Sequence, residues 1–139
     1  MGYFGFRFSG RADALASFLE APVFQPGGAE AWRSFGKTRE LPDDAEATFR
    51  LPMGLGDEGS AESQVENARK FLEDSETQLA ALLATKVLGL VALEFSWEVP
   101  GDGFARALTF PPAMTEVCGR LGIEIAITAF VVEGRAFEG

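Results

Sequence analysis

Carboxylates are the side chains of this sequence with the greatest capacity for chemistry, and they concentrate in one stretch. Residues 57–76 hold seven acidic residues against two basic ones. Glu58, Glu62 and Glu66 recur every four residues, so a helix that begins early would carry them on one face. Such a surface favours a basic protein as partner. A solvated helix face, with acids near the positive N-terminus of the helix, is the alternative interpretation. The candidate partner-binding residues are Asp57, Glu58, Glu62, Glu66 and Glu73.

A second group of charges falls on predicted strands. Strand alternation places Arg7, Arg50 and Glu94 on the outward face of the sheet. Glu94 and Glu98 are four residues apart, about 13 Å along a strand, which is too far for a catalytic pair. Glu124 on a neighbouring strand could approach either one and provide general acid-base chemistry. Cross-strand ion pairing of these carboxylates with Arg7 or Arg50 is the more frequent arrangement.

A third candidate is the segment 32–39, which combines basic and aromatic residues. It could stack a base or hold a phosphate, but Ala31 stands where a Walker A loop needs glycine. Docking of Trp32 and Phe35 onto the core is the alternative. A ligand pocket between the loop over 22–44 and the sheet would use Trp32, Arg33, Phe35, Lys37, Arg7 and Glu94.

Other chemistries lack their usual residues. The chain has no histidine, and its one cysteine, Cys118, shares an apolar helical stripe with Met114 and Val117. Most catalytic constellations and transition-metal sites need histidine or clustered cysteine. We therefore expect no catalytic residues, no metal and no cofactor. The net charge of −9 disfavours binding to nucleic acid or to an anionic membrane.

Cysteine use and hydropathy bear on the compartment. A single cysteine cannot form a disulfide within the chain, and the first residues lack the pattern of a signal peptide. The longest apolar run, 87–93, is too short to cross a bilayer. We therefore expect a cytoplasmic protein. The length of 139 residues fits a single domain.

Apolar periodicity predicts the elements that would position these groups. Alternation predicts strands over 3–9, 47–53, 88–98 and 123–132, and a turn at 100–103 predicts a return strand over 104–110. Helical spacing predicts helices over 12–20, 61–85 and 111–121. The helix over 61–85 would begin with a capping box of Ser63 and Glu66, or with Ser60 as a rival cap.

Proline and glycine predict the irregular segments and, with them, the fold. Residues 22–44 read as a long aromatic-containing loop with one helical turn around 29–34, and 133–139 as a loose tail. Strands separated by helices, with one hairpin, predict an α+β fold. Its sheet would be mainly antiparallel with the helices packed on one face, as a two-layer sandwich.

Several segments resemble a family of small bacterial proteins classed as a domain of unknown function. They are the strand at 3–10, the helix-to-proline passage at 15–22, the segment 32–37, and 108–112 leading into 123–132. Together they are spread over most of the length of the chain, from residue 3 to residue 132. The resemblance implies a compact α+β fold without an established activity. An interaction or immunity-type role is suspected for such families.

Acidic charge and the residues absent from the chain together predict a non-catalytic binding module. It would be of inhibitory or immunity type and would engage a basic protein through an acidic helix surface. The alternative is a small-molecule binding protein or weak enzyme, with its pocket between 22–44 and the sheet. A homodimer formed through the open sheet face or an edge strand is a third interpretation.

Overall fold

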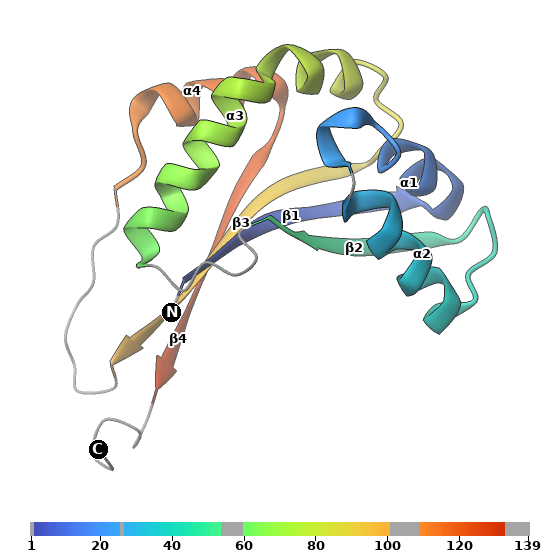
Figure 1. Ribbon diagram of the computed structural model, residues 1–139, viewed down its shortest axis with the longest axis horizontal. Coiled ribbons are helices and arrows are strands. Elements are labelled where there is room, and N and C mark those ends of the chain that lie inside the picture. The colour runs from blue at the N-terminus through green and yellow to red at the C-terminus, as the bar shows by residue number, and fades with distance from the viewer. Residues whose placement is uncertain (1, 26, 54–59, 101–108, 133–139) are drawn as a thin grey trace.

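The computed structural model (Figure 1) describes residues 2–25, 27–53, 60–100 and 109–132. Within them lie four strands in one mixed sheet of order β2-β1-β3-β4. The central strand β1 is antiparallel to β2 and to β3, whereas β3 and β4 are parallel. The predicted α+β class with a mainly antiparallel sheet is confirmed. The elements are β1 (Gly2–Arg11), α1 (Ala12–Phe18), η1 (Pro22–Phe24), α2 (Gly27–Arg39), β2 (Glu46–Pro52), α3 (Ala61–Leu83), β3 (Leu90–Pro100), α4 (Pro112–Leu121) and β4 (Glu124–Val132).

The strand register gathers the apolar side chains on one face of the sheet. Phe6 of β1 lies opposite Leu51 of β2 and Leu93 of β3. All three are buried, because successive strand residues point to opposite faces and the helices cover this one. Figure 1 shows α3 and α4 together over one end of the sheet and α1 and α2 near the other. The second face carries the polar residues of each strand.

Aromatic contacts fix the N-terminal helices to β1. Phe6 and Phe8 are fully buried. Phe24 of η1 meets both rings edge-on, at centroid distances of 5.9 and 5.5 Å, and Phe18 of α1 lies 5.2 Å from Phe8. Each buried phenylalanine contributes about 1.5–3 kcal/mol, and each favourable ring pair adds about 0.5–1.5 kcal/mol. This cluster therefore ties η1 and α1 to the centre of the sheet.

The prediction of a long loop over 22–44 is wrong for most of that segment, because η1 and the 13-residue helix α2 occupy it. Trp32 and Phe35 of α2 pack edge-on against Phe49 of β2, at centroid distances of 5.4 and 5.3 Å. Gly28 sits where a Cβ atom would lie only 2.9 Å from the Cβ of Phe24. Tertiary packing thus stabilises a helix that its own glycines disfavour.

The helices α3 and α4 begin and end within two residues of their predicted bounds, 61–85 and 111–121. Ser60 caps α3, since its hydroxyl accepts a hydrogen bond of 3.2 Å from the Ser63 N–H; the cap is thus Ser60 and not Ser63. Gly122 ends α4 in the left-handed region at φ 75°, which glycine adopts without strain.

Two predicted segments lie largely outside the described residues. The return strand over 104–110 falls mostly on 101–108, and the tail at 133–139 also lies outside the described residues. Residues 109 and 110 belong to no strand. Among the strands that the structure describes, β3 is paired with β1 and β4. The neighbour of β3 away from β1 is therefore a parallel strand reached through α4.

Candidate functional site

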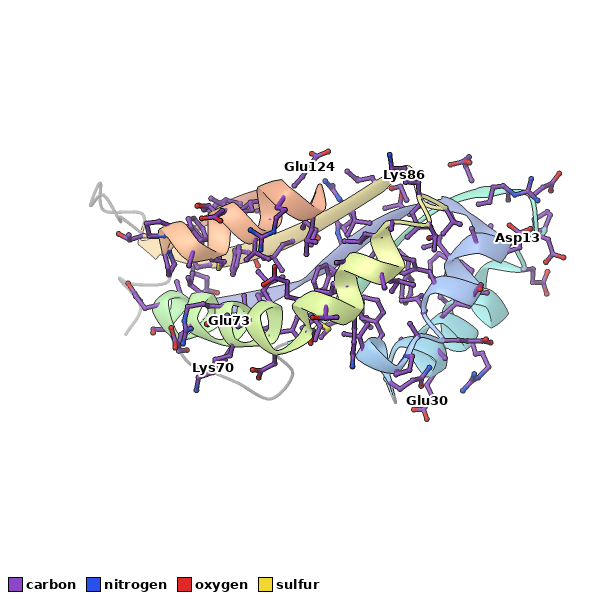
Figure 2. The ribbon with its side chains drawn as sticks, turned by 90° about the horizontal axis from the view of Figure 1, so that it is seen from above. Asp13, Glu30, Lys70, Glu73, Lys86 and Glu124 are labelled. Carbon is purple, nitrogen blue, oxygen red and sulfur yellow. The ribbon has the colours of Figure 1, made fainter. Side chains whose placement is uncertain are left out.

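The acidic surface predicted from the sequence lies on the outer side of α3. Glu62, Glu66, Glu73 and Asp74 are exposed there, because the apolar stripe of α3 faces the sheet. Figure 2 looks down on the helices and shows Lys70 on the side of α3 away from α4. Asp57 and Glu58, which were also predicted to belong to this surface, lie outside the described residues.

Arg69 holds two of these carboxylates together. Its Nε donates a hydrogen bond of 2.9 Å to Glu66, one turn before it, and its guanidinium also bonds Glu73, one turn after it. The hydrogen bond from Arg69 holds the pKa of Glu66 below its usual range. Glu66 is therefore ionised at neutral pH, and the shared bonds to Arg69 restrict the positions of both carboxylates on the helix surface.

A second arginine connects α3 to α4. Arg120 of α4 bonds Glu116 at 3.1 Å within its own helix and also bonds Glu76 of α3. These contacts raise the pKa of Arg120. The two helices together carry six carboxylates and three basic side chains, a net charge of −3. Ion pairing within this surface therefore leaves it acidic. Its acidic residues are Glu62, Glu66, Glu73, Asp74, Glu76 and Glu116; we call these the α3–α4 acidic surface.

The open face of the sheet holds an ion-pair cluster across three strands. Glu94 of β3 accepts a hydrogen bond of 3.1 Å from Nε of Arg50 on β2, and its other oxygen lies 3.6 Å from Nε of Arg7 on β1. Gly5 lies opposite Glu94 on β1, and its missing side chain leaves room for Glu94 to reach β2. The side chain of Glu94 is only 14% exposed. The predicted cross-strand ion pairing is confirmed for Glu94.

The predicted ligand pocket does not form as one site, because its residues lie on opposite faces of the sheet. Trp32 and Phe35 pack on Phe49, on the helix-covered face. Arg7 and Glu94 occupy the open face. The predicted docking of the two aromatic rings onto the core is confirmed, and their ring centroids lie 5.2 Å apart. The remaining two predicted residues lie on α2, where Arg33 is exposed and Lys37 is close to the helix end.

A groove that the sequence did not predict lies between the α1–η1 corner and the end of α3. Its volume is ≈ 380 Å³, and its surface is largely apolar. The sequence signal for it is weak. Ala81 and Leu82 extend the apolar character of α3 beyond its buried stripe, and Pro22 and Val23 belong to η1, the next element after α1. The lining residues are Ala21, Pro22, Val23, Gln78, Ala81, Leu82 and Thr85.

The environments of the cysteine and of the metal-ligating residues do not form a catalytic or metal site within the described ranges. Cys118 is buried, and burial raises the pKa of its thiol to about 11, so it is protonated at neutral pH and a poor nucleophile. Within the described ranges, no three or more metal-ligating side chains lie together. Over the same residues, no helix combines the length and the apolar character needed to cross a membrane.

Comparisons with protein-family models, with curated proteins and with solved structures give no match for this chain. The resemblance to a bacterial family therefore stays a prediction. Three features of the molecule bear on its function: the α3–α4 acidic surface, the open sheet face and the apolar groove.

Proposed function

We propose that this protein is a non-catalytic binding module that engages a basic protein through the α3–α4 acidic surface. The observation that carries the proposal is the arrangement of Arg69 and Arg120. Each arginine bonds two carboxylates and restricts them, while the surface keeps a net charge of −3. Carboxylates already held in place lose less conformational freedom when a partner binds.

Electrostatics also supports a basic partner. The chain carries a net charge of −9, so its field attracts positively charged proteins and accelerates their encounter with it. The residues with the greatest catalytic potential have other roles: Cys118 is a buried neutral thiol and Glu94 is paired with two arginines. Inhibition of a basic enzyme, as by an immunity-type protein of the bacterial cytoplasm, is the form of this function that the sequence resemblance suggests.

The test compares two triple variants that change the net charge by the same amount. Glu62→Gln, Glu66→Gln and Glu73→Gln remove charge from the α3–α4 acidic surface. Glutamine keeps the size of glutamate and its helix propensity. The matched control removes three exposed carboxylates elsewhere: Glu20→Gln, Glu30→Gln and Glu46→Gln.

Affinity capture from the native cell at low and moderate salt identifies the partner, and titration with the purified partner gives the Kd. We expect the α3 variant to bind on the order of tenfold more weakly, since three exposed ion pairs contribute about 0.2–1 kcal/mol each. The control should bind as the unaltered protein does. Absence of a basic partner at low salt, or equal loss of affinity in both variants, would contradict the proposal.

A second function is favoured by the apolar groove. Its ≈ 380 Å³ falls within the range of small-molecule sites, about 300–1,000 Å³. We propose an apolar small molecule as its ligand. Thermal unfolding in the presence of indole, decanoate and hydrophobic amino acids tests this, with Ala81→Trp as the variant that fills the groove. Stabilisation should be seen for the unaltered protein and lost in the variant; equal stabilisation of both would refute a ligand in this groove.

A further inference from the structure

The strand β4 forms an edge of the sheet that the structure describes. In that sheet its neighbour is β3, so the backbone groups on its other side lack a described strand partner. Its nine residues carry a single charge, at Glu124, and no proline, lysine or glycine. Figure 2 shows Glu124 at the outer edge of the molecule, pointing away from it. Edges of this kind pair readily with further strands unless charge, proline or a covering element protects them.

The opposite edge of the same sheet has such protection. β2 is seven residues long, presents Glu46 and Arg50 as exposed charges and ends at Pro52. On its helix-facing side, Phe49 is buried beneath the aromatic rings of α2. The two edges of one sheet thus differ in charge, in length and in cover.

The side chains of β4 are also exposed. Ile127 lies opposite the buried Phe95 of β3 and therefore on the helix-covered face, yet it is 50% exposed. The next residues, Thr128 and Ala129, are exposed as well, whereas Ile123, immediately before the strand, is buried. In Figure 1 the C-terminal half of β4 extends away from the helices. Among the described residues, this half of the strand has no strand partner along its outer edge, and it carries an exposed apolar side chain.

We propose that β4 pairs antiparallel with β4 of a second copy of this chain, forming a two-fold homodimer. An interface about a two-fold axis must be complementary to itself. With Ile127 opposite its own copy, Ala126 faces Thr128 and Ile125 faces Ala129, so small residues accompany larger ones at each pair.

Charge favours this antiparallel arrangement. Glu124 would face Phe130 of the second copy and lie about 20 Å from the other Glu124 along the strands. A parallel pairing in register would instead place the two carboxylates side by side, which is destabilising.

The dimer would contain one continuous sheet of eight described strands. Antiparallel neighbours keep the same face on the same side, so both helix layers would cover one face and the two open faces would join. Ile127 of each copy would lose its exposure to water against the other, on the helix-covered side. The α3–α4 acidic surface is not part of this contact, so the dimer and the proposed function can fail independently.

The experiment measures molar mass by sedimentation velocity and by light scattering over a wide range of protein concentration. Ile127→Lys places two like charges opposite each other at the two-fold axis. Its matched control is Val87→Lys, because Val87 is 49% exposed but lies between α3 and β3 in the chain and is not part of β4. We expect dimers for the unaltered protein and for V87K, and monomers for I127K.

A mixture of I127K with I127E should restore the dimer mass, because opposite charges then meet at the axis. Circular dichroism checks that each variant is folded; should I127K not fold, Thr128→Lys, on the exposed opposite face of the strand, replaces it. If the unaltered protein is monomeric at all concentrations, the proposal is overturned, and a strand of a different protein becomes the candidate partner of β4. Folded dimers of I127K as stable as those of V87K would also overturn it.

Discussion

Two adjacent glycines at the start of α2 provide a sharp test of how this helix is held. At Gly28, a Cβ atom would lie 2.9 Å from the Cβ of Phe24 and 3.0 Å from the carbonyl oxygen of Leu19. Both distances are shorter than an ordinary contact, and the oxygen belongs to the backbone, so η1 and α2 would have to separate. At Gly27 no heavy atom lies within 4 Å of the same added carbon.

The two substitutions should therefore change stability in opposite directions. Overpacking costs about 1–3 kcal/mol, whereas replacing a helical glycine by alanine contributes about 0.5–1 kcal/mol. We expect Gly28→Ala to lower the free energy of unfolding by about 1–2 kcal/mol. Gly27→Ala, which has only the favourable effect, should raise it by up to about 0.5 kcal/mol, less than within a helix because Gly27 is the first residue of α2.

Urea unfolding followed by tryptophan fluorescence measures both, because Trp32 of α2 stacks on Phe35 and contacts Phe49. The m-value should be equal in the two variants, so that the midpoint alone reports the change. If Gly28→Ala were as stable as Gly27→Ala, the close approach of α2 to η1 would not exist in solution.

Three further predictions concern Glu94 and Cys118. Glu94→Gln leaves Arg7 and Arg50 without their shared anion and should lower the free energy of unfolding by about 1 kcal/mol. Glu98→Gln changes an exposed residue on the same face of β3 and should leave this free energy unchanged; equal effects of the two substitutions in urea unfolding would contradict the ion-pair cluster. The Cys118 thiol, buried with a pKa of about 11, should react with a disulfide reagent at neutral pH only after denaturation, and rapid labelling of the native protein would refute its burial. Because the unfolded thiol loses its proton above about pH 9 and the folded one only near 11, the unfolded state binds fewer protons in that window, so stability should fall as pH rises through it; Cys118→Ala should remove this part of the fall.

The parts of this fold that depend on a local sequence pattern could be predicted from the sequence. The alternation around Phe6 predicts β1 and the face that it buries, and Gly122 predicts the end of α4. The charge cluster of the open face was also predictable, because Arg7, Arg50 and Glu94 fall on the same side of their strands by alternation alone.

The parts that the sequence did not predict depend on contacts between distant segments. The glycines at 27 and 28 indicate a turn when read locally, but the helix there is stabilised by Phe49, which comes after it in the chain. The prediction of the ligand pocket was wrong for the same reason, since no local sequence pattern shows which face of the sheet α2 covers. The pairing of β3 with a parallel strand also escaped prediction, because a turn after β3 favoured a hairpin.

The position of β1 at the centre of the sheet has a consequence during synthesis of the chain. Gly2 pairs with Trp97 and Arg11 with Glu46, so β1 leaves the ribosome long before its second neighbour exists. Until then the phenylalanines of β1 lack their neighbours on β3. Proteins dominated by such distant pairings fold slowly, and their intermediates expose apolar strands that aggregate. A ribosome-bound chaperone that shields β1 until β3 emerges would therefore be expected to raise the yield of folded protein.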